Sequence, residues 1–232
     1  MLSEKPVLQL LSAMSVMQAF QREVIPAWEV AGRSVAVNWM PTALIVERFT
    51  SGETCDIAIV TREAMEQLVQ AGKIIKGSVR DLVSSQIGFA VAPGIPQPDL
   101  SSVNSFMNSL LSYSRIAFSE RGASGILFVG LMERLGISDD IKSRTVPVYA
   151  GLCAEKIISG EADIAVQQVS ELLTVPGITL AGALPEEYGC NLSFSVGICC
   201  ATMHQEAGEQ FIQFLLNDSA RDSYRRSGLT PV

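Results

Sequence analysis

Residues 40–74 have the sequence MPTALIVERFTSGETCDIAIVTREAMEQLVQAGKI and contain one short apolar run between two amphipathic segments. The run Asp56–Val60 is rich in β-branched residues, which is typical of a buried strand. Before it, apolar residues recur at helical spacing in Ala43–Thr50. After it, Thr61 is a good N-cap for a second helix, which Gly72 would end. We therefore predict a helix–strand–helix unit of an α/β fold.

The same alternation extends from this unit in both directions. Towards the N-terminus we predict strands at Val7–Leu11 and Ser34–Asn38 and a helix at Val16–Trp28. Strands that alternate with helices favour a parallel sheet. The Pro- and Gly-rich residues 93–98 lie near an expected crossing between two lobes, and the last helices are expected to return to the first lobe. The further predicted elements are Gln86–Ala92, Arg115–Phe118, Ile126–Leu135, Val146–Val148, Leu152–Ile158, Asp163–Gln168, Ser193–Ala201, Glu206–Leu216 and Ser219–Ser227.

The composition excludes several classes of protein. The chain has 232 residues, which fits one large domain or two smaller lobes. Hydrophobic residues make up 48% and charged residues 18%, so disorder is excluded as the main state. A net charge of −7 has the wrong sign for general binding to nucleic acid or to an anionic membrane. We expect no nucleic-acid partner, and any anionic ligand must be held by local groups.

Targeting signals and cysteine pairs are not evident. No apolar run approaches the ~18 residues that a membrane span needs. Residues 1–6 are charge-balanced and do not have the pattern of an export signal. We therefore expect a cytoplasmic protein from the chain as given, or a periplasmic one if the chain is a trimmed mature form. The five cysteines include no CxxC pair and there is one His, so we expect free thiols and no metal site.

The strand-to-helix turns are the candidate binding positions. In α/β sheets, ligands bind beyond the carboxyl ends of the strands, where helix N-termini offer unpaired N–H groups. Small hydroxyl and glycine residues at such turns can bind an anion without a formal cation. The same Ser and Thr residues are equally expected as ordinary helix caps. The candidate turns are Ser12–Ser15, Met40–Thr42, Thr61, Ser119–Gly125, Tyr149–Gly151 and Gln167–Ser170.

Three motifs together resemble a known family over nearly the whole chain. They are SAMSVMQAF at residues 12–20, the stretch 40–74, and ISGEADIAVQQVSELL at residues 158–173. They resemble the molybdate-binding-protein-like branch of the type 2 periplasmic-binding-protein superfamily. The resemblance implies two Rossmann-like α/β lobes, joined by two crossing strands, with a ligand cleft between them. The first lobe would comprise residues 1–88 and 195–232, and the second residues 89–194.

The resemblance also implies site residues. Ser15 matches the oxyanion-binding serine of the first lobe, and Thr42 falls at the second hydroxyl position, although Met40 and Pro41 replace the usual small residues. Gln168 stands where molybdate binders often have a tyrosine. These departures favour a ligand of a different shape from molybdate. Further candidates are Ser124 and Gly125, which match the helix N-terminus of the second lobe, and Ser12, Met14 and Tyr149 at the neighbouring turns.

Arg121 is a candidate that the residues themselves suggest. A guanidinium can bind a carboxylate through two parallel hydrogen bonds. The alternative is a loop arginine paired with Glu120. Glu120 and Glu47 are considered as bases, but a carboxylate beside a helix is usually solvated. The single His204 follows an apolar strand, away from every candidate turn, and is expected at the surface.

The leading hypothesis is therefore a solute-binding domain that closes by a hinge motion on a small anion, either an organic carboxylate or a tetrahedral oxyanion. If it is exported, it would partner the membrane components of an ABC transporter. The alternative is an isomerase on the same scaffold, because the resembled branch includes aconitate isomerases; its base would be Glu120, Tyr149 or a serine. A third hypothesis is a ligand-sensing module for a partner protein. We assign no catalytic residue, cofactor or metal.

Overall fold

The computed structural model describes residues 6–30, 32–119, 121–149, 151–185, 188 and 190–232. The chain forms two compact units, Met1–Ser84 with Ser193–Val232, and Ser85–Leu192. It passes from the first unit to the second within strand β4 (Arg80–Val91) and returns within β9 (Asn191–Ile198). The boundaries expected from the sequence, after residues 88 and 194, fall within these same two strands.

The sheet of the first unit is built on three parallel strands. β1 (Val7–Ser12), β2 (Ser34–Trp39) and β3 (Ile57–Thr61) were all predicted as strands, and the structure places β1 between the other two. β9 pairs antiparallel with β3, and β10 (Thr230–Pro231) pairs antiparallel with the first part of β4. Because β1, β2 and β3 run in the same direction, their carboxyl ends meet at one edge of the sheet.

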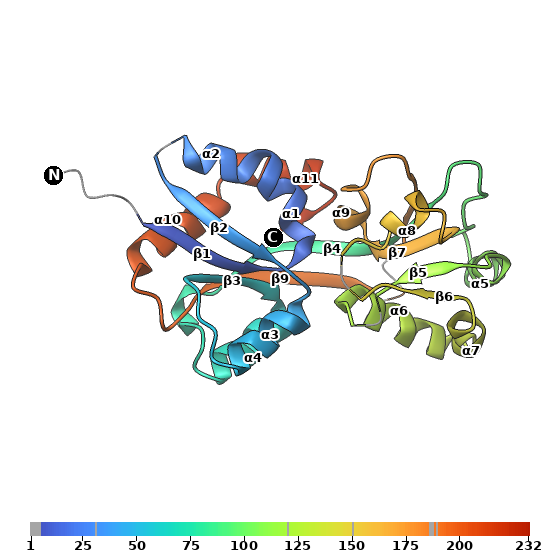
Figure 1. The fold of residues 1–232 in the computed structure, drawn as a ribbon, viewed down its shortest axis with the longest axis horizontal. Coiled ribbons are helices and arrows are strands. Elements are labelled where there is room, and N and C mark those ends of the chain that lie inside the picture. The colour runs from blue at the N-terminus through green and yellow to red at the C-terminus, as the bar shows by residue number, and fades with distance from the viewer. Residues whose placement is uncertain (1–5, 31, 120, 150, 186–187, 189) are drawn as a thin grey trace. The chain divides into compact units, whose positions relative to one another are not determined.

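Helices cover both faces of this sheet (Figure 1). α3 (Thr42–Thr50) and α4 (Arg62–Gln70) pack on one face, where Phe49 and Leu68 join a buried cluster with strand residues. α1 (Met17–Ala19), α2 (Ile25–Glu29), α10 (Gln205–Leu215) and α11 (Asp218–Arg226) lie on the other face. A short 3-10 turn at Lys76–Ser78 leads into β4.

The first helical segment is less regular than the predicted helix Val16–Trp28. It runs as a 3-10 turn (Met14–Val16), α1, a π-helical turn (Phe20–Val24) and α2. Pro26 explains the wide turn, because it has no N–H to donate to the carbonyl four residues earlier and its ring crowds that carbonyl. Ile25 N–H instead donates to the carbonyl of Phe20, five residues back.

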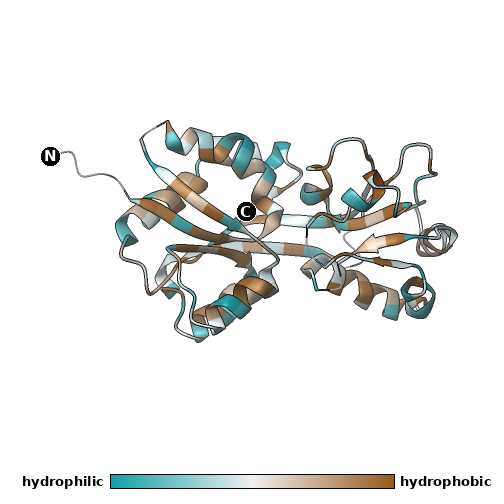
Figure 2. Ribbon diagram, viewed as in Figure 1, coloured by the Kyte–Doolittle hydropathy of each residue, from teal (hydrophilic) through white to brown (hydrophobic). Residues whose placement is uncertain are grey.

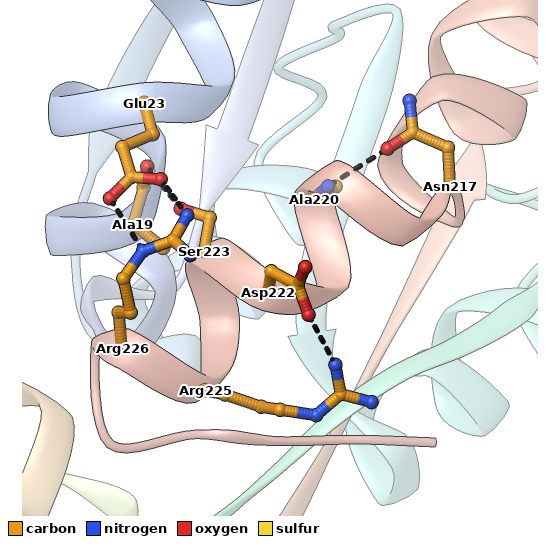
Figure 3. Close-up of polar contacts among 8 residues, drawn as sticks. All are labelled: Ala19, Glu23, Asn217, Ala220, Asp222, Ser223, Arg225 and Arg226. Carbon is orange, nitrogen blue, oxygen red and sulfur yellow. Dashed lines mark hydrogen bonds and ion pairs between the residues drawn. The ribbon is translucent and has the colours of Figure 1, made fainter.

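Helix α11 is attached to this first segment by polar contacts (Figure 3). The Arg226 guanidinium pairs with the Glu23 carboxylate, and Ser223 Oγ donates to the carbonyl of Ala19 at 3.4 Å. The hydrogen bond from Arg226 lowers the pKa of the Glu23 carboxyl. Asn217 is the N-cap of α11, and its side chain accepts a hydrogen bond from Ala220 N–H at 2.8 Å. The end of the chain is thereby held in the first unit.

The second unit has its own mixed sheet. β7 (Ile164–Gln168) lies between β4, which is antiparallel to it, and β5 (Ile116–Phe118), which is parallel. β6 (Thr145–Pro147) continues the sheet parallel to β5. β8 (Thr179–Ala183), which was not predicted, pairs antiparallel with β4.

The two faces of this second sheet carry side chains of different size. Phe89 and Phe118 point to the face covered by α5 (Val103–Ser112), α6 (Ala123–Arg134) and α7 (Ser138–Lys142). Their strand neighbours Ala90 and Ala117 point to the face covered by α8 (Glu155–Ile158) and α9 (Val169–Leu172). Figure 2 shows the strands largely in brown, in keeping with a buried sheet. In the described residues, no helix is long and apolar enough to span a membrane.

Candidate functional site

The carboxyl edge of the first unit brings distant hydroxyl residues together. Ser12 ends β1, and its carbonyl accepts from Met40 N–H at 3.1 Å, just after β2. Thr42 begins α3, and its Oγ1 accepts from Thr61 N–H, at the end of β3, with a distance of 3.4 Å. Three turns that the sequence singled out therefore lie at one edge.

These residues differ in how much surface they offer to a ligand. Ser12 and Ser15 are 0% and 1% exposed, and Ser12 Oγ donates to the carbonyl of Ala13 at 3.1 Å. Met14 and Thr42 are half-buried. Ser12 therefore builds the turn, whereas Thr42 is the more exposed of the two hydroxyl residues.

Two helices that begin at candidate turns, α3 and α6, lack side-chain caps. α4, α5 and α11 are capped by Thr61, Ser102 and Asn217, each of which accepts from an N–H of the first turn. α3 follows Pro41 and α6 follows Gly122, and neither of these N-cap residues supplies a side-chain acceptor. The first N–H groups of α3 and α6 can therefore donate to an anion, which the helix dipole also favours. α10, outside the candidate turns, is uncapped as well.

The second unit has a comparable edge, where the parallel strands β5 and β7 end. After β5, Ser119 Oγ accepts from Gly122 N–H at 3.1 Å and tightens the turn. The sequence placed Ser124 and Gly125 in a loop before a helix at Ile126; the structure places both in the first turn of α6, where they are buried. Gln168 ends β7 and is 4% exposed.

Two predicted residues lie at the surface. Arg121 is exposed and makes no hydrogen bond or ion pair within the described part of the chain. Glu120, its alternative partner, lies outside the described residues. Tyr149 is 80% exposed. The structure thus groups Ser12, Ser15 and Thr42 in the first unit and Ser124, Gly125 and Gln168 in the second, while Arg121 and Tyr149 project from loops.

Glu171 is a charged residue at this second edge that the sequence argument did not select. It is 6% exposed, and its Oε1 accepts from Gln168 Nε2 at 3.4 Å. Burial, with a contribution from the Glu171 carboxylate, raises the pKa of the Cys153 thiol, so this thiol is protonated at neutral pH. An acidic residue in the first turn of a helix is commonly solvated and interacts with the helix dipole. That pattern alone therefore gave no reason to expect that Glu171 is buried. Its place in the turn that follows a buried strand, three residues after Gln168, was the available signal.

The other titratable candidates lie away from these edges. Glu47 is exposed on α3. His204 is exposed and lines a pocket of about 490 Å³ with Leu8 and Ser34, near the amino ends of β1 and β2. That pocket is thus at the opposite ends of these strands from Ser12. Within the described residues, no group of His, Cys, Asp and Glu side chains could hold a metal ion.

Comparison with known proteins gives matches along almost the full chain. A family model described as bacterial extracellular solute-binding protein matches residues 8–230. Aconitate isomerase from Pseudomonas sp is 30% identical over 240 residues, which cover 100% of this chain and 91% of that protein.

Solved structures show the same fold at lower identity. The periplasmic molybdate-binding protein of Azotobacter vinelandii has a TM-score of 0.81 and 15% identity, over 96% of this chain and 98% of that one. The sulfate-binding protein SubI of Mycobacterium tuberculosis H37Rv has a TM-score of 0.74 and 16% identity, over 97% and 87% of the two chains. The predicted α/β architecture of type 2 periplasmic binding proteins is confirmed.

Proposed function

Because the chain belongs to the bacterial extracellular solute-binding protein family, we propose that it binds a small unsaturated polycarboxylate and isomerises it, as an aconitate isomerase does. The observation that carries this proposal is the 30% identity to aconitate isomerase over 100% of the chain. The alternative hypothesis from the sequence is thereby favoured over a receptor without turnover.

The reaction is a proton shift within one molecule. A proton leaves the methylene carbon of the substrate, the double bond moves by one carbon–carbon bond, and a proton adds to the carbon that was vinylic. No electrons are gained or lost. The protein must hold several carboxylates, stabilise the negative charge that develops when the proton leaves, and supply an acid–base group.

The anion-binding features suit such a substrate. The uncapped N-termini of α3 and α6 supply N–H donors, and Thr42 supplies a hydroxyl. Arg121 is exposed and offers a guanidinium, which suits a planar carboxylate through two parallel hydrogen bonds. Donors of several kinds are what a polycarboxylate needs. This combination supports an organic polyanion over a single tetrahedral oxyanion.

A receptor without turnover is the second candidate. It is favoured by the TM-scores of 0.81 and 0.74 to proteins named as molybdate-binding and sulfate-binding. In that case the chain would act outside the cytoplasm and would deliver a bound anion to the membrane components of an ABC transporter. Such a protein needs the same donors but no acid–base group.

The deciding experiment adds the purified protein to cis-aconitate and follows trans-aconitate by proton NMR. We expect interconversion well above the rate without protein, and an increase in melting temperature with either isomer. A ligand at 100 times its Kd adds about 2.7 kcal/mol to the stability, or roughly 5–10 °C for a chain of this size. Citrate, molybdate and sulfate are the comparison ligands. Stabilisation by molybdate or sulfate alone, with no interconversion, would refute the isomerase and favour the receptor.

A further inference from the structure

A buried carboxylate and a buried amide lie together in the turn between β7 and α9. Gln168 ends the strand and Glu171 lies in the first turn of the helix, and the two residues are 4% and 6% exposed. Glutamate is rarely buried this completely. In the described residues of the second unit, the other glutamates, Glu133, Glu155 and Glu161, are exposed. Glu171 therefore stands apart from them.

One end of the Gln168 side-chain amide makes a hydrogen bond, and the other end makes none among the described residues. Its Nε2 donates to Glu171 Oε1 at 3.4 Å. Its Oε1 is buried and has no hydrogen-bond partner among the described residues. Native proteins seldom keep a buried polar atom unsatisfied, and an exception of this kind points to a ligand or a catalytic role.

The two ends of this amide can exchange by half a turn about the side-chain bond. When Glu171 is ionised, Gln168 Nε2 donates to it, as in the structure. When Glu171 is protonated, its O–H donates to Gln168 Oε1, and Nε2 becomes available to a ligand carboxylate. The pair can thus take up a proton and keep a hydrogen bond in both states.

Gln168 and Glu171 also lie where ligands bind in α/β proteins, beyond the carboxyl end of a strand. Gln168 lies at the carboxyl end of β7, beside the parallel strand β5, whose following turn leads into the uncapped helix α6. Gln167 Oε1 accepts from Cys153 N–H at 2.7 Å, which fixes the segment before α8 against the same turn. Ser170 Oγ lies 3.5 Å from Ser85 Oγ. Hydrogen bonds therefore hold the turn in a defined geometry.

We infer that Glu171 is the acid–base group of the isomerisation and that Gln168 positions its proton; this inference rests on the proposed function. The Glu171 carboxylate removes a proton from the methylene carbon, and the electron pair of that C–H bond forms the new double bond. The electron pair of the old double bond forms a C–H bond at the far carbon with the proton that Glu171 returns. The carboxylate is regenerated, and no further reactant is consumed.

The test compares three variants, Glu171→Gln, Glu171→Asp and Gln168→Met, and one control variant with the wild-type protein, with cis-aconitate as substrate. Glu171→Gln keeps the size and the hydrogen-bonding capacity but cannot carry the proton. Positioned acid–base groups contribute about 10²–10⁴-fold, so we expect kcat to fall by at least about 100-fold. Binding of trans-aconitate, measured by calorimetry, should remain within about threefold. Glu155→Gln is the matched control, because Glu155 is exposed on α8 of the same unit, and we expect no change in kcat.

A second readout separates catalysis from structure. In D₂O the wild-type protein should incorporate deuterium into the substrate, and Glu171→Gln should lose this exchange without a lower melting temperature. If Glu171→Gln does not fold, Glu171→Asp retains a carboxylate that is displaced by one methylene. We expect this variant to fold and to lower kcat by about tenfold or more with KM nearly unchanged. An unchanged kcat in Glu171→Asp would overturn the inference.

Gln168→Met provides the third variant. It removes the amide but retains the length of the side chain, and we expect a lower kcat than that of the wild-type protein. A wild-type protein that does not interconvert the aconitates would refute the proposed function, and the inference with it. A wild-type protein that is active while Glu171→Gln retains its kcat would refute the role of Glu171 alone.

Discussion

Arg121 shows what a single residue contributes to the proposed site. Arg121 directly precedes Gly122, the N-cap of α6, so it belongs to the same short turn as the first N–H groups of that helix. It is exposed and makes no ion pair within the described residues. Because no hydrogen bond or ion pair among the described residues engages this guanidinium, we propose that it binds the ligand.

Removal of this guanidinium is therefore predicted to affect binding and not stability. Arg121→Ala should weaken binding of trans-aconitate by about 1.5–3 kcal/mol, the scale of a hydrogen bond to a charged group. The melting temperature without ligand should stay within about 1 °C, since surface substitutions change stability little. Calorimetry and thermal unfolding measure the two effects. Lys142→Ala, an exposed cation at the end of α7, is the control. An equal loss in both variants would show a general charge effect.

At the same scale, the sequence predicted a local helix cap but did not select a buried acid. Thr61 could be predicted as an N-cap because the cap is a local interaction, and the structure confirms it. Glu171 could not, because its burial depends on segments that are distant in sequence. Its neighbours in space include Gln168 and Cys153, and Cys153 belongs to a different segment of the chain, just before α8.

At the scale of elements, local sequence pattern predicted the parallel strands, because each is a short, mostly apolar run, and β3 and β7 are buried along their whole length. It missed α5, whose Ser and Asn residues have low helix propensity. That helix forms because Ser102 caps it and because Phe106 and Leu110, four residues apart, are both buried. It also missed β8, whose half-buried residues have no alternating pattern and include Gly182.

Two elements of the first unit bring a pair of cysteines together. Cys55, just before β3, and Cys199, just after β9, have sulfur atoms 3.2 Å apart and are both buried. The sequence suggested no pairing. The mutual hydrogen bond and burial raise the pKa of the Cys199 thiol, which makes it slow to react in the folded protein.

The two sulfur atoms lie close together, but Cys199 reacts slowly once the protein is folded. We therefore expect a Cys55–Cys199 disulfide to form when the protein is refolded with oxidised glutathione. A link between residues so far apart in sequence typically adds about 2–4 kcal/mol, which corresponds to roughly 5–15 °C in melting temperature. Peptide mass mapping without reduction identifies the bond, and thermal unfolding with and without reductant measures its effect. Cys55→Ser should abolish both, whereas Cys190→Ser should abolish neither. Pairing of Cys55 with another cysteine would contradict the prediction.

At the scale of the whole molecule, the resemblance of three motifs predicted the family, and the match over residues 8–230 confirms it. The motifs supply most of the first carboxyl edge and the β7–α9 turn of the second. The identity of the ligand did not follow, because helix N-termini and hydroxyl groups accept any small anion. The two edges belong to different units of the chain, so the number of ligands bound is a question about the whole molecule.

Thr42 lies at the carboxyl edge of the first unit. Thr42→Val should weaken binding of trans-aconitate, measured by calorimetry, by about tenfold or more, because it removes a hydroxyl donor to a charged group. Thr50→Val is the control for this substitution, since Thr50 is exposed at the end of α3 and its hydroxyl donates to the carbonyl of Val46. An unchanged affinity in Thr42→Val, or an equal loss of affinity in both variants, would contradict a role of the Thr42 hydroxyl in binding.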